Sequence, residues 1–276
     1  MTVSSSQEKF FPKKRLGQNF LVNRSVQERI VQACELHSDE VVLEIGPGQG
    51  ALTKLIAPKV KELIAVEKDR QLIDYLRRII KEDNVKIIHA DILEFPLEKI
   101  IPPTKMIGNL PYNIATPILE RMIHCRRSIP ALYITVQKEY AKRLAAGPGS
   151  KDYGSLSCFI QYYADVKVLF DIARGVFRPV PKVRSSFVRC LFHKTPAVVA
   201  TDENFLFALI RKAFQQRRKT LENALSALIA KELFREIAGT VGIDPKARAE
   251  EIPLNKFVGL ANELDRRGIT FGRPSL

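Results

Sequence analysis

Short apolar runs alternate with stretches of helical spacing between residues 41 and 136. The runs, rich in β-branched residues, are typical of buried parallel strands. They are Val41–Ile45, Leu63–Val66, Val85–Ile88, Lys105–Ile107 and Ala131–Val136. Helices are predicted between several of them, over Ala51–Ala57, Gln71–Ile80 and Thr116–Ile123, with Pro58 as a helix stop. This alternation predicts an α/β fold with an open, doubly wound parallel sheet, whose ligands bind beyond the carboxyl ends of the strands.

The pattern changes in the second part of the chain. Two later apolar runs, Val166–Asp171 and Phe187–Phe192, flank the proline-containing segment Arg178–Arg184, which predicts an antiparallel hairpin at the sheet edge. From Asp202 onward the spacing is helical, with a second helix over Leu221–Ile229. We therefore predict two domains, an α/β domain over residues 1–200 and a small helical domain over residues 201–276.

A glycine-rich turn follows the first predicted strand. The segment Glu44-Ile-Gly-Pro-Gly-Gln-Gly50-Ala51 matches the dinucleotide-binding pattern, and Glu67 stands about 20 residues further on, where a carboxylate binds ribose hydroxyls. A nicotinamide-dependent dehydrogenase is thus one interpretation. The other is a loop for S-adenosylmethionine, favoured because Glu44, Asp91 and Asn109 also fall at strand ends. Capping of the following helices is the alternative role for Glu67 and Asp91.

The segment Asn109-Leu-Pro-Tyr112 carries the most specific chemistry. The Asn109 side chain offers a carbonyl acceptor, and the Leu110 carbonyl cannot bond to the nitrogen of Pro111, which has no hydrogen. Two acceptors are then available for one exocyclic amine, and Tyr112 offers a flat face for a purine. The segment indicates methylation of an adenine amine, although a proline-tyrosine turn after a strand can also be purely structural.

The net charge points to a polyanionic partner. Lys and Arg number 44 against 30 Asp and Glu, which gives +14 and a pI near 9.7. No carboxylate stands between Asp171 and Asp202. The basic residues that we expect to contact phosphates are Lys13, Lys14, Arg15, Arg174, Arg178, Lys182, Arg184, Arg189, Lys194, Arg211, Lys212, Arg217, Arg218 and Lys219.

Several classes are disfavoured by what the sequence lacks. No apolar run reaches the 18 or so residues that span a bilayer, and residues 1–12 resemble no targeting segment, so we expect no membrane partner and a cytoplasmic location. The four cysteines stand far apart without a paired spacing. We expect four buried, reduced thiols and no metal ion.

Seven segments together resemble one family. They are Leu16-Gly-Gln-Asn-Phe-Leu21, Glu44-Ile-Gly-Pro-Gly-Gln-Gly50, Val66-Glu-Lys-Asp69, Asn109-Leu-Pro-Tyr112, Gln137-Lys-Glu139, Phe177-Arg-Pro-Val-Pro-Lys-Val183 with Ser185, and Arg217-Arg-Lys-Thr-Leu221. These are similar to the signatures of the KsgA-type ribosomal RNA adenine dimethyltransferases, over about residues 9–262. The related Erm enzymes share the core but usually carry Ile at the position of Leu110.

The resemblance implies a Rossmann-like class I methyltransferase that uses S-adenosylmethionine to dimethylate N6 of two adjacent adenines near the 3′ end of small-subunit (16S) ribosomal RNA. It implies a cytoplasmic, monomeric enzyme of ribosome biogenesis acting on this RNA and the pre-30S particle. The implied cofactor-binding residues are Asn19, Leu21, Glu44, Gly46, Gly48, Glu67, Asp91 and Asn109. The implied catalytic residues are Asn109, Leu110, Tyr112 and Phe177, of which Tyr112 and Phe177 would stack on the target base. The remaining alternatives are the dehydrogenase and a non-catalytic nucleic-acid-binding module.

Overall fold

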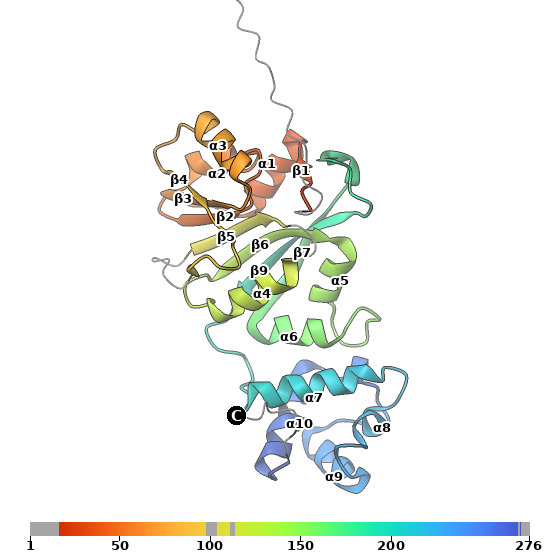
Figure 1. Ribbon diagram of the computed structural model, residues 1–276. Helices are drawn as coiled ribbons and strands as arrows, with labels where there is room; N and C mark the ends of the chain where they lie inside the picture. Colours follow the sequence, from red (N-terminus) through yellow and green to blue (C-terminus); the bar gives the residue numbers. More distant parts are fainter. Residues whose placement is uncertain (1–16, 98–103, 111–113, 270, 272–276) are drawn as a thin grey trace, which may run out of the picture. The chain divides into compact units, whose positions relative to one another are not determined.

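A computed structural model describes residues 17–97, 104–110, 114–269 and 271 of the chain (Figure 1). The chain forms two compact units that interleave in sequence. One comprises Met1–Lys138 with Leu169–Phe187, and the other comprises Glu139–Val168 with Val188–Leu276. The structural division therefore does not follow the boundary near residue 200 that the sequence predicts, because the predicted hairpin strands belong in part to each unit. A functional division at that boundary stays a prediction.

The predicted parallel sheet is confirmed. Its parallel strands are β2 (Val41–Ile45), β3 (Glu62–Glu67), β4 (Val85–His89), β5 (Thr104–Asn109) and β6 (Ala131–Gln137). The full strand order is β4-β3-β2-β5-β6-β9-β7. The chain begins this sheet at β2, adds β3 and β4 on one side, and then crosses back to place β5 on the other side of β2. The reversal between β2 and β5 is the point at which open α/β sheets bind ligands.

The predicted hairpin also forms, from β7 (Ala164–Ile172) and β9 (Ser185–Phe192), with β7 at the sheet edge. The His193 amide donates to the Tyr163 carbonyl at 2.8 Å, and the Ser186 hydroxyl donates to Asp171 at 2.7 Å. Because each strand's end thus meets the other strand's start, the two run antiparallel.

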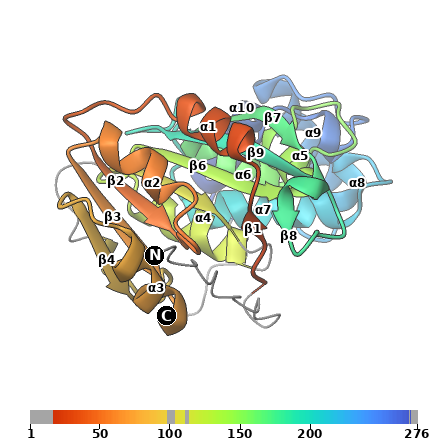
Figure 2. The same cartoon turned by 90° about the horizontal axis from the view of Figure 1, so that it is seen from above.

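A second, two-stranded sheet was not predicted from the sequence. Strand β1 (Phe20–Leu21) pairs antiparallel with β8 (Phe177–Arg178), which follows the short helix η5 (Arg174–Val176), as Figure 2 shows. Two-residue strands leave no periodic signal, because a period of two needs several residues to be visible.

The helices of the first unit are α1 (Arg24–Ala33), α2 (Thr53–Ile56), η2 (Ala57–Lys59), α3 (Arg70–Ile79) and α4 (Ala115–His124). Three of them, α2, α3 and α4, lie within or close to the predicted ranges, whereas α1 was not predicted. In Figure 1, α1, α2 and α3 lie on one side of the sheet and α4 on the other. The α-helix α2 ends at Ile56, just ahead of Pro58, as the sequence predicts, and Pro58 lies in the first turn of η2, where a missing N–H costs nothing.

The second unit is mainly helical. Its helices are α5 (Lys138–Ala145, of which Lys138 belongs to the first unit), α6 (Ser155–Tyr163), α7 (Glu203–Gln215), α8 (Leu221–Leu225), α9 (Lys231–Val241), η6 (Ala249–Glu251) and α10 (Leu254–Arg266). Asp202 caps α7 by accepting from the Phe205 amide at 3.0 Å. The second predicted helix is shorter than expected and ends at Leu225.

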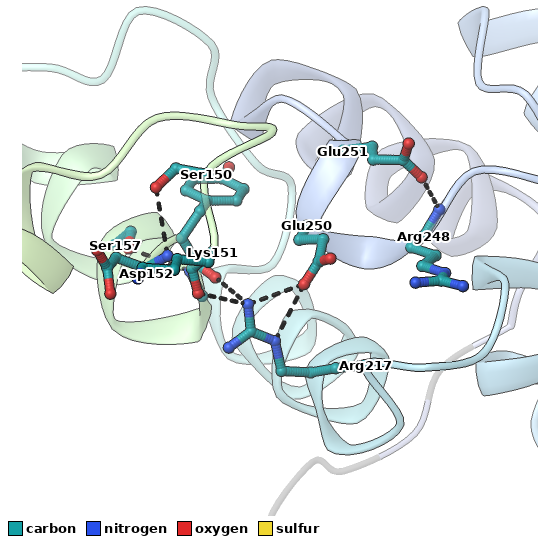
Figure 3. Close-up of polar contacts among 10 residues, drawn as sticks. Ser150, Lys151, Asp152, Ser157, Arg217, Arg248, Glu250 and Glu251 are labelled. Atoms are coloured by element: carbon teal, nitrogen blue, oxygen red, sulfur yellow. Dashed lines mark hydrogen bonds and ion pairs between the residues drawn. The ribbon is translucent and has the colours of Figure 1, made fainter.

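Arg217 fastens a loop within this unit (Figure 3). Its Nη2 donates to the carbonyls of Lys151 and Tyr153 at 2.8 and 3.3 Å and to Glu250 Oε2 at 2.8 Å. The Gly149 amide donates to the Glu250 carbonyl at 2.7 Å. Arg217 was predicted as a phosphate ligand, but its guanidinium holds protein groups. Arg218 beside it is exposed, and its phosphate contact stays a prediction.

Gly108, near the end of β5, occupies a position where a side chain does not fit. An added Cβ would lie 2.9 Å from Leu110 Cδ2 and 3.1 Å from Ile45 Cβ, in a sheet without spare space. We expect Gly108→Ala to lower the free energy of unfolding by about 1–3 kcal/mol through overpacking. Chemical denaturation followed by circular dichroism measures this difference.

The matched control is Gly147→Ala, because an added Cβ at that exposed glycine meets no atom within 4 Å. This variant should unfold like the parent protein. Equal stabilities of the two alanine variants would contradict tight packing between β5 and β2.

Candidate functional site

A pocket opens at the carboxyl ends of β2, β3 and β5, within the first unit. It encloses about 230 Å³, far more than the roughly 10–15 Å³ that one water needs, so it has room for an organic ligand. Of the predicted site residues, those lining it are Asn19, Leu21, Glu44, Gly46, Gly48, Glu67, Asp91, Asn109, Leu110 and Phe177. Tyr112 lies outside the described residues. The pocket therefore brings together residues from six separate segments of the chain.

The glycine-rich turn forms one wall of the pocket. Gly46 and Gly48 have φ angles of 62° and 60°, a left-handed conformation that other residues adopt only with strain. The Gly46 amide donates to the Val66 carbonyl at 2.9 Å, which fastens the turn to β3. An added Cβ at Gly48 would lie 3.1 Å from the Phe20 ring. The glycines thus let the backbone approach both the pocket and β1.

Glu67 ends β3 with a carboxylate that is only 6% exposed. Its Oε1 accepts from the Asp69 amide at 2.9 Å and its Oε2 from the Gly48 amide at 3.1 Å. Burial raises the pKa of this carboxyl above its ordinary value, and the backbone amides oppose that rise. Each oxygen keeps a further lone pair, so Glu67 can join the turn to β3 and still accept from a ligand.

Glu44 lies within β2 and is buried more deeply, at 2% exposed. Its Oε2 accepts from the Thr53 hydroxyl at 2.7 Å, a contact that the sequence did not reveal because threonine is common at helix starts. Burial raises the pKa of Glu44 to about 7, and the nearby Glu67 adds to the rise. A buried carboxylate of this kind is stabilised by a cationic ligand.

Asp91 lies in the pocket wall, at the turn that follows β4. Its Oδ1 accepts from the Leu93 amide at 3.0 Å within this turn, where no α-helix follows in residues 91–96, and its Oδ2 pairs with Lys68. Burial would raise the pKa of Asp91, but the hydrogen bonds from Lys68 and Leu93 lower it overall, so the group is a carboxylate at neutral pH. Its place in the pocket wall leaves a ligand role as a prediction.

Asn109 ends β5 beside the Thr135 position of β6, and Leu110 follows directly. The Asn109 Nδ2 donates to the main-chain carbonyl of Asn19 at 2.9 Å, and the Leu110 amide is 3.3 Å from the Thr135 carbonyl. The Leu110 side chain is buried. These contacts fix the two residues that supply the predicted acceptors at the edge of the pocket.

Phe177 differs from the expectation of an open stacking surface. The residue lines the pocket, but only 2% of it is exposed, as for a core aromatic. A base could stack on its ring only after a local opening, so this role stays a prediction.

Gln18, which the sequence reasoning missed, also lines the pocket and donates to Asp69 Oδ2 at 3.1 Å. A polar residue in the irregular segment before β1 gives no sequence signal of that contact.

The described residues contain no group of three or more His, Cys, Asp or Glu side chains that could hold a metal ion. Among the same residues, no helix is long and apolar enough to cross a membrane. Cys34, Cys158 and Cys190 are buried thiols as predicted, whereas Cys125 is half-buried.

Strand order, glycine-rich turn and pocket together define a Rossmann-like class I methyltransferase fold. The chain is similar to a crystal structure of a dimethyladenosine transferase from Plasmodium falciparum, with a TM-score of 0.80 and 23% identity over 91% of this chain and 99% of that one. It is also similar to the structure of the 23S rRNA methyltransferase ErmE, with a TM-score of 0.73 and 22% identity over 89% and 99% of the two chains.

Sequence similarity is more specific than the fold. The family described as ribosomal RNA adenine dimethylase matches residues 10–266. A relative from Alkaliphilus metalliredigens, named ribosomal RNA small subunit methyltransferase A, is 39% identical over 269 residues, which cover 94% of each chain. The chain therefore belongs to the ribosomal RNA adenine dimethylase family, and it is a methyltransferase.

The buried Glu44 carboxyl makes stability depend on pH. Its pKa is raised from 4.5 to about 7, so the folded state holds a proton that the unfolded chain releases between these values. The contribution of the Glu44 carboxyl to the free energy of unfolding is therefore complete below pH 4.5 and is lost as the pH rises to about 7. We expect Glu44→Gln, which keeps the acceptor for Thr53, to remove this loss.

The measurement is the free energy of unfolding of both proteins without added cofactor, between pH 4.5 and pH 8. The Gln variant should gain on the parent by up to about 3 kcal/mol as the pH rises through that window. A difference that does not change with pH would show that Glu44 is ionised in the folded protein throughout.

Proposed function

We propose that this protein transfers methyl groups to N6 of two adjacent adenines near the 3′ end of small-subunit ribosomal RNA, using S-adenosylmethionine. The observation that supports this most directly is the position of Asn109 and Leu110 in the wall of the same pocket as Glu44, Glu67 and the glycine-rich turn. An acceptor pair for an amine and a carboxylate-lined cavity for a cationic donor thus share one space.

The residues present fit S-adenosylmethionine. Two buried carboxylates, Glu44 and Glu67, suit a ligand that carries a cationic ammonium and ribose hydroxyls. Gly46 and Gly48 let the backbone come close to it. Asp91, with the apolar Ile92 and Leu93 beside it in the wall, suits the adenine end. When bound, the cofactor supplies an electrophilic methyl group on a sulfonium.

Asn109 and Leu110 act on the nucleophile. The lone pair of an adenine N6 is delocalised into the ring, so this nitrogen attacks poorly until it becomes pyramidal. The Asn109 side-chain oxygen and the Leu110 carbonyl can accept its two hydrogens, hold it in that shape and stabilise its developing positive charge. No general base is needed, because the methylated nitrogen is acidic enough to lose its proton to water.

Access to the pocket requires an unpaired or flipped base. We infer that Tyr112 and Phe177 stack on it, each contributing about 1–3 kcal/mol.

Four basic residues close to Phe177 in sequence are exposed and suit RNA phosphates; they are Arg174, Arg178, Lys182 and Arg184. Arg189, predicted to join them, is half-buried in β9, and its Nε is buried without a partner among the described residues. Recognition would thus rest on RNA shape and backbone, with one base read chemically.

In this proposal the substrate is the RNA within an assembling small subunit (the pre-30S particle), and the enzyme is a cytoplasmic monomer. The decisive experiment measures transfer of labelled methyl from S-adenosylmethionine to small subunits that lack this modification, followed by nucleoside analysis. N6,N6-dimethyladenosine is the expected product. Salt-sensitive RNA binding without transfer would instead favour a non-catalytic assembly factor.

Asn109→Ala tests the amine acceptor. We expect kcat to fall by about 10²–10³-fold, since one preorganised hydrogen bond to a transition state contributes that much. RNA affinity, measured by filter binding, should change little because phosphate contacts dominate it. Asn84→Ala serves as the control, because Asn84, which precedes β4, donates to the main-chain carbonyls of Ala57 and Val60 and does not line the pocket. An active Asn109→Ala enzyme would refute the acceptor role.

Basic residues beside Phe177 should determine the salt dependence of RNA binding. Lys182→Gln and Arg184→Gln should each lower the slope of log affinity against log salt concentration by about 0.7–0.9, as one phosphate contact does. Lys81→Gln, an equally exposed change between α3 and β4, should leave the slope as it is. If all three variants have the same slope as the parent protein, Lys182 and Arg184 do not contact RNA phosphates.

A further inference from the structure

The Asn109 side chain can present either of two opposite groups to a ligand. One end of the amide is a carbonyl acceptor and the other is an NH2 donor, and a half-turn exchanges them with almost no change of shape. Only the carbonyl end can accept from a target amine, so the wrong orientation would set donor against donor. Some group in the protein must select the orientation.

The structure contains such a group. The Asn109 Nδ2 donates to the main-chain carbonyl oxygen of Asn19 at 2.9 Å, a contact between residues 90 positions apart. A carbonyl can only accept, so it would repel Asn109 Oδ1 if the amide turned over. No hydrogen bond to Asn109 Oδ1 is found within the part of the chain that the structure describes, which leaves this oxygen for a ligand.

The Asn19 carbonyl is itself held in place from both sides. On the N-terminal side of Asn19, Gln18 Nε2 donates at 3.1 Å to Oδ2 of Asp69, a residue that follows β3 in the chain. After it, Leu21 pairs with Phe177 in the small sheet, and the Leu21 carbonyl accepts from buried Gln27 at 2.8 Å. The Val22 amide donates to the Val176 carbonyl at 2.9 Å. We call residues 17–22 the strap.

We propose that the strap is a positioning element for methyl transfer, and that the Asn19 carbonyl sets the amide of Asn109 with its oxygen toward the target amine. This inference rests on the proposed function. It assigns the main chain of Asn19 a task separate from any contact of its side chain with the cofactor, and it makes the NH2 group of Asn109, rather than only its oxygen, necessary for the reaction.

Asn109→Asp tests the inference, because aspartate has the same shape and keeps an acceptor oxygen but cannot donate to Asn19 when ionised. We expect kcat at pH 8 to fall by about 10²-fold or more. The ratio of variant to parent kcat should recover as the pH falls toward 5, since a protonated carboxyl can again donate to the Asn19 carbonyl. The other carboxyls that line this pocket, Glu44, Glu67 and Asp91, are present in both proteins, so their effect on the rate cancels in that ratio.

Hydrogen exchange of the protein alone gives a readout that needs no activity. In Asn109→Asp, the strap amides of Leu21 and Val22 should exchange about tenfold faster at neutral pH than in the parent. The matched control is Asn84→Asp, which also removes donors to main-chain carbonyls, those of Ala57 and Val60. That control should leave strap exchange unchanged.

The outcomes separate the inference from the function beneath it. The inference is overturned if Asn109→Asp is as active as the parent at pH 8, or if exchange of the strap amides is unchanged. In either case an inactive Asn109→Ala enzyme would still support the proposed function. A parent protein that forms no dimethyladenosine on small subunits overturns the proposed function itself. Loss of activity at pH 8 with acid recovery and faster strap exchange supports both.

Discussion

Two carboxylates buried at neighbouring strand ends impose the constraint on which the site depends. Glu44 and Glu67 lie on adjacent parallel strands, so the sheet register itself brings them together. Among the residues that the structure describes, no cationic side chain pairs with either one; instead, backbone amides of Gly48 and Asp69 and the hydroxyl of Thr53 hold them. Such an arrangement is costly in an empty pocket and favourable once a cationic ligand enters. In the proposed function, selectivity for a positively charged cofactor is thus a property of the sheet as well as of individual side chains.

The sequence predicted the sheet and most of the pocket because both depend on periodic patterns and on the rule that parallel strands end at one edge. Glu44, Glu67, Asp91 and Asn109 follow from that rule. Contacts through irregular segments did not follow: the pairing of β1 with β8, the bond from Thr53 to Glu44 and the burial of Phe177 depend on where distant segments meet. The interleaving of the two units was missed for the same reason, since composition changes near residue 196 but contacts divide elsewhere.

Net charge proved a weaker guide than individual contacts. The excess of basic residues predicts affinity for a polyanion, yet the exposed Arg217 binds oxygens of the protein itself, and Arg189 is half-buried. An arginine can hold three main-chain or carboxylate oxygens at once, which a lysine cannot do with fixed geometry. Exposed basic residues close to Phe177 in sequence remain the better guide to an RNA-binding surface than the total of +14.

The pairing of β1 with β8 has a consequence for the order in which the protein is made. Phe20 finds its partner Arg178 only after the whole parallel sheet has been synthesised, and Asn19 cannot be fixed before then. A ribosome builds the chain from its N-terminus, and early segments fold as they emerge. Chains that end before β8 would therefore carry the pocket residues of the parallel sheet without the pairing that holds the segment around Asn19.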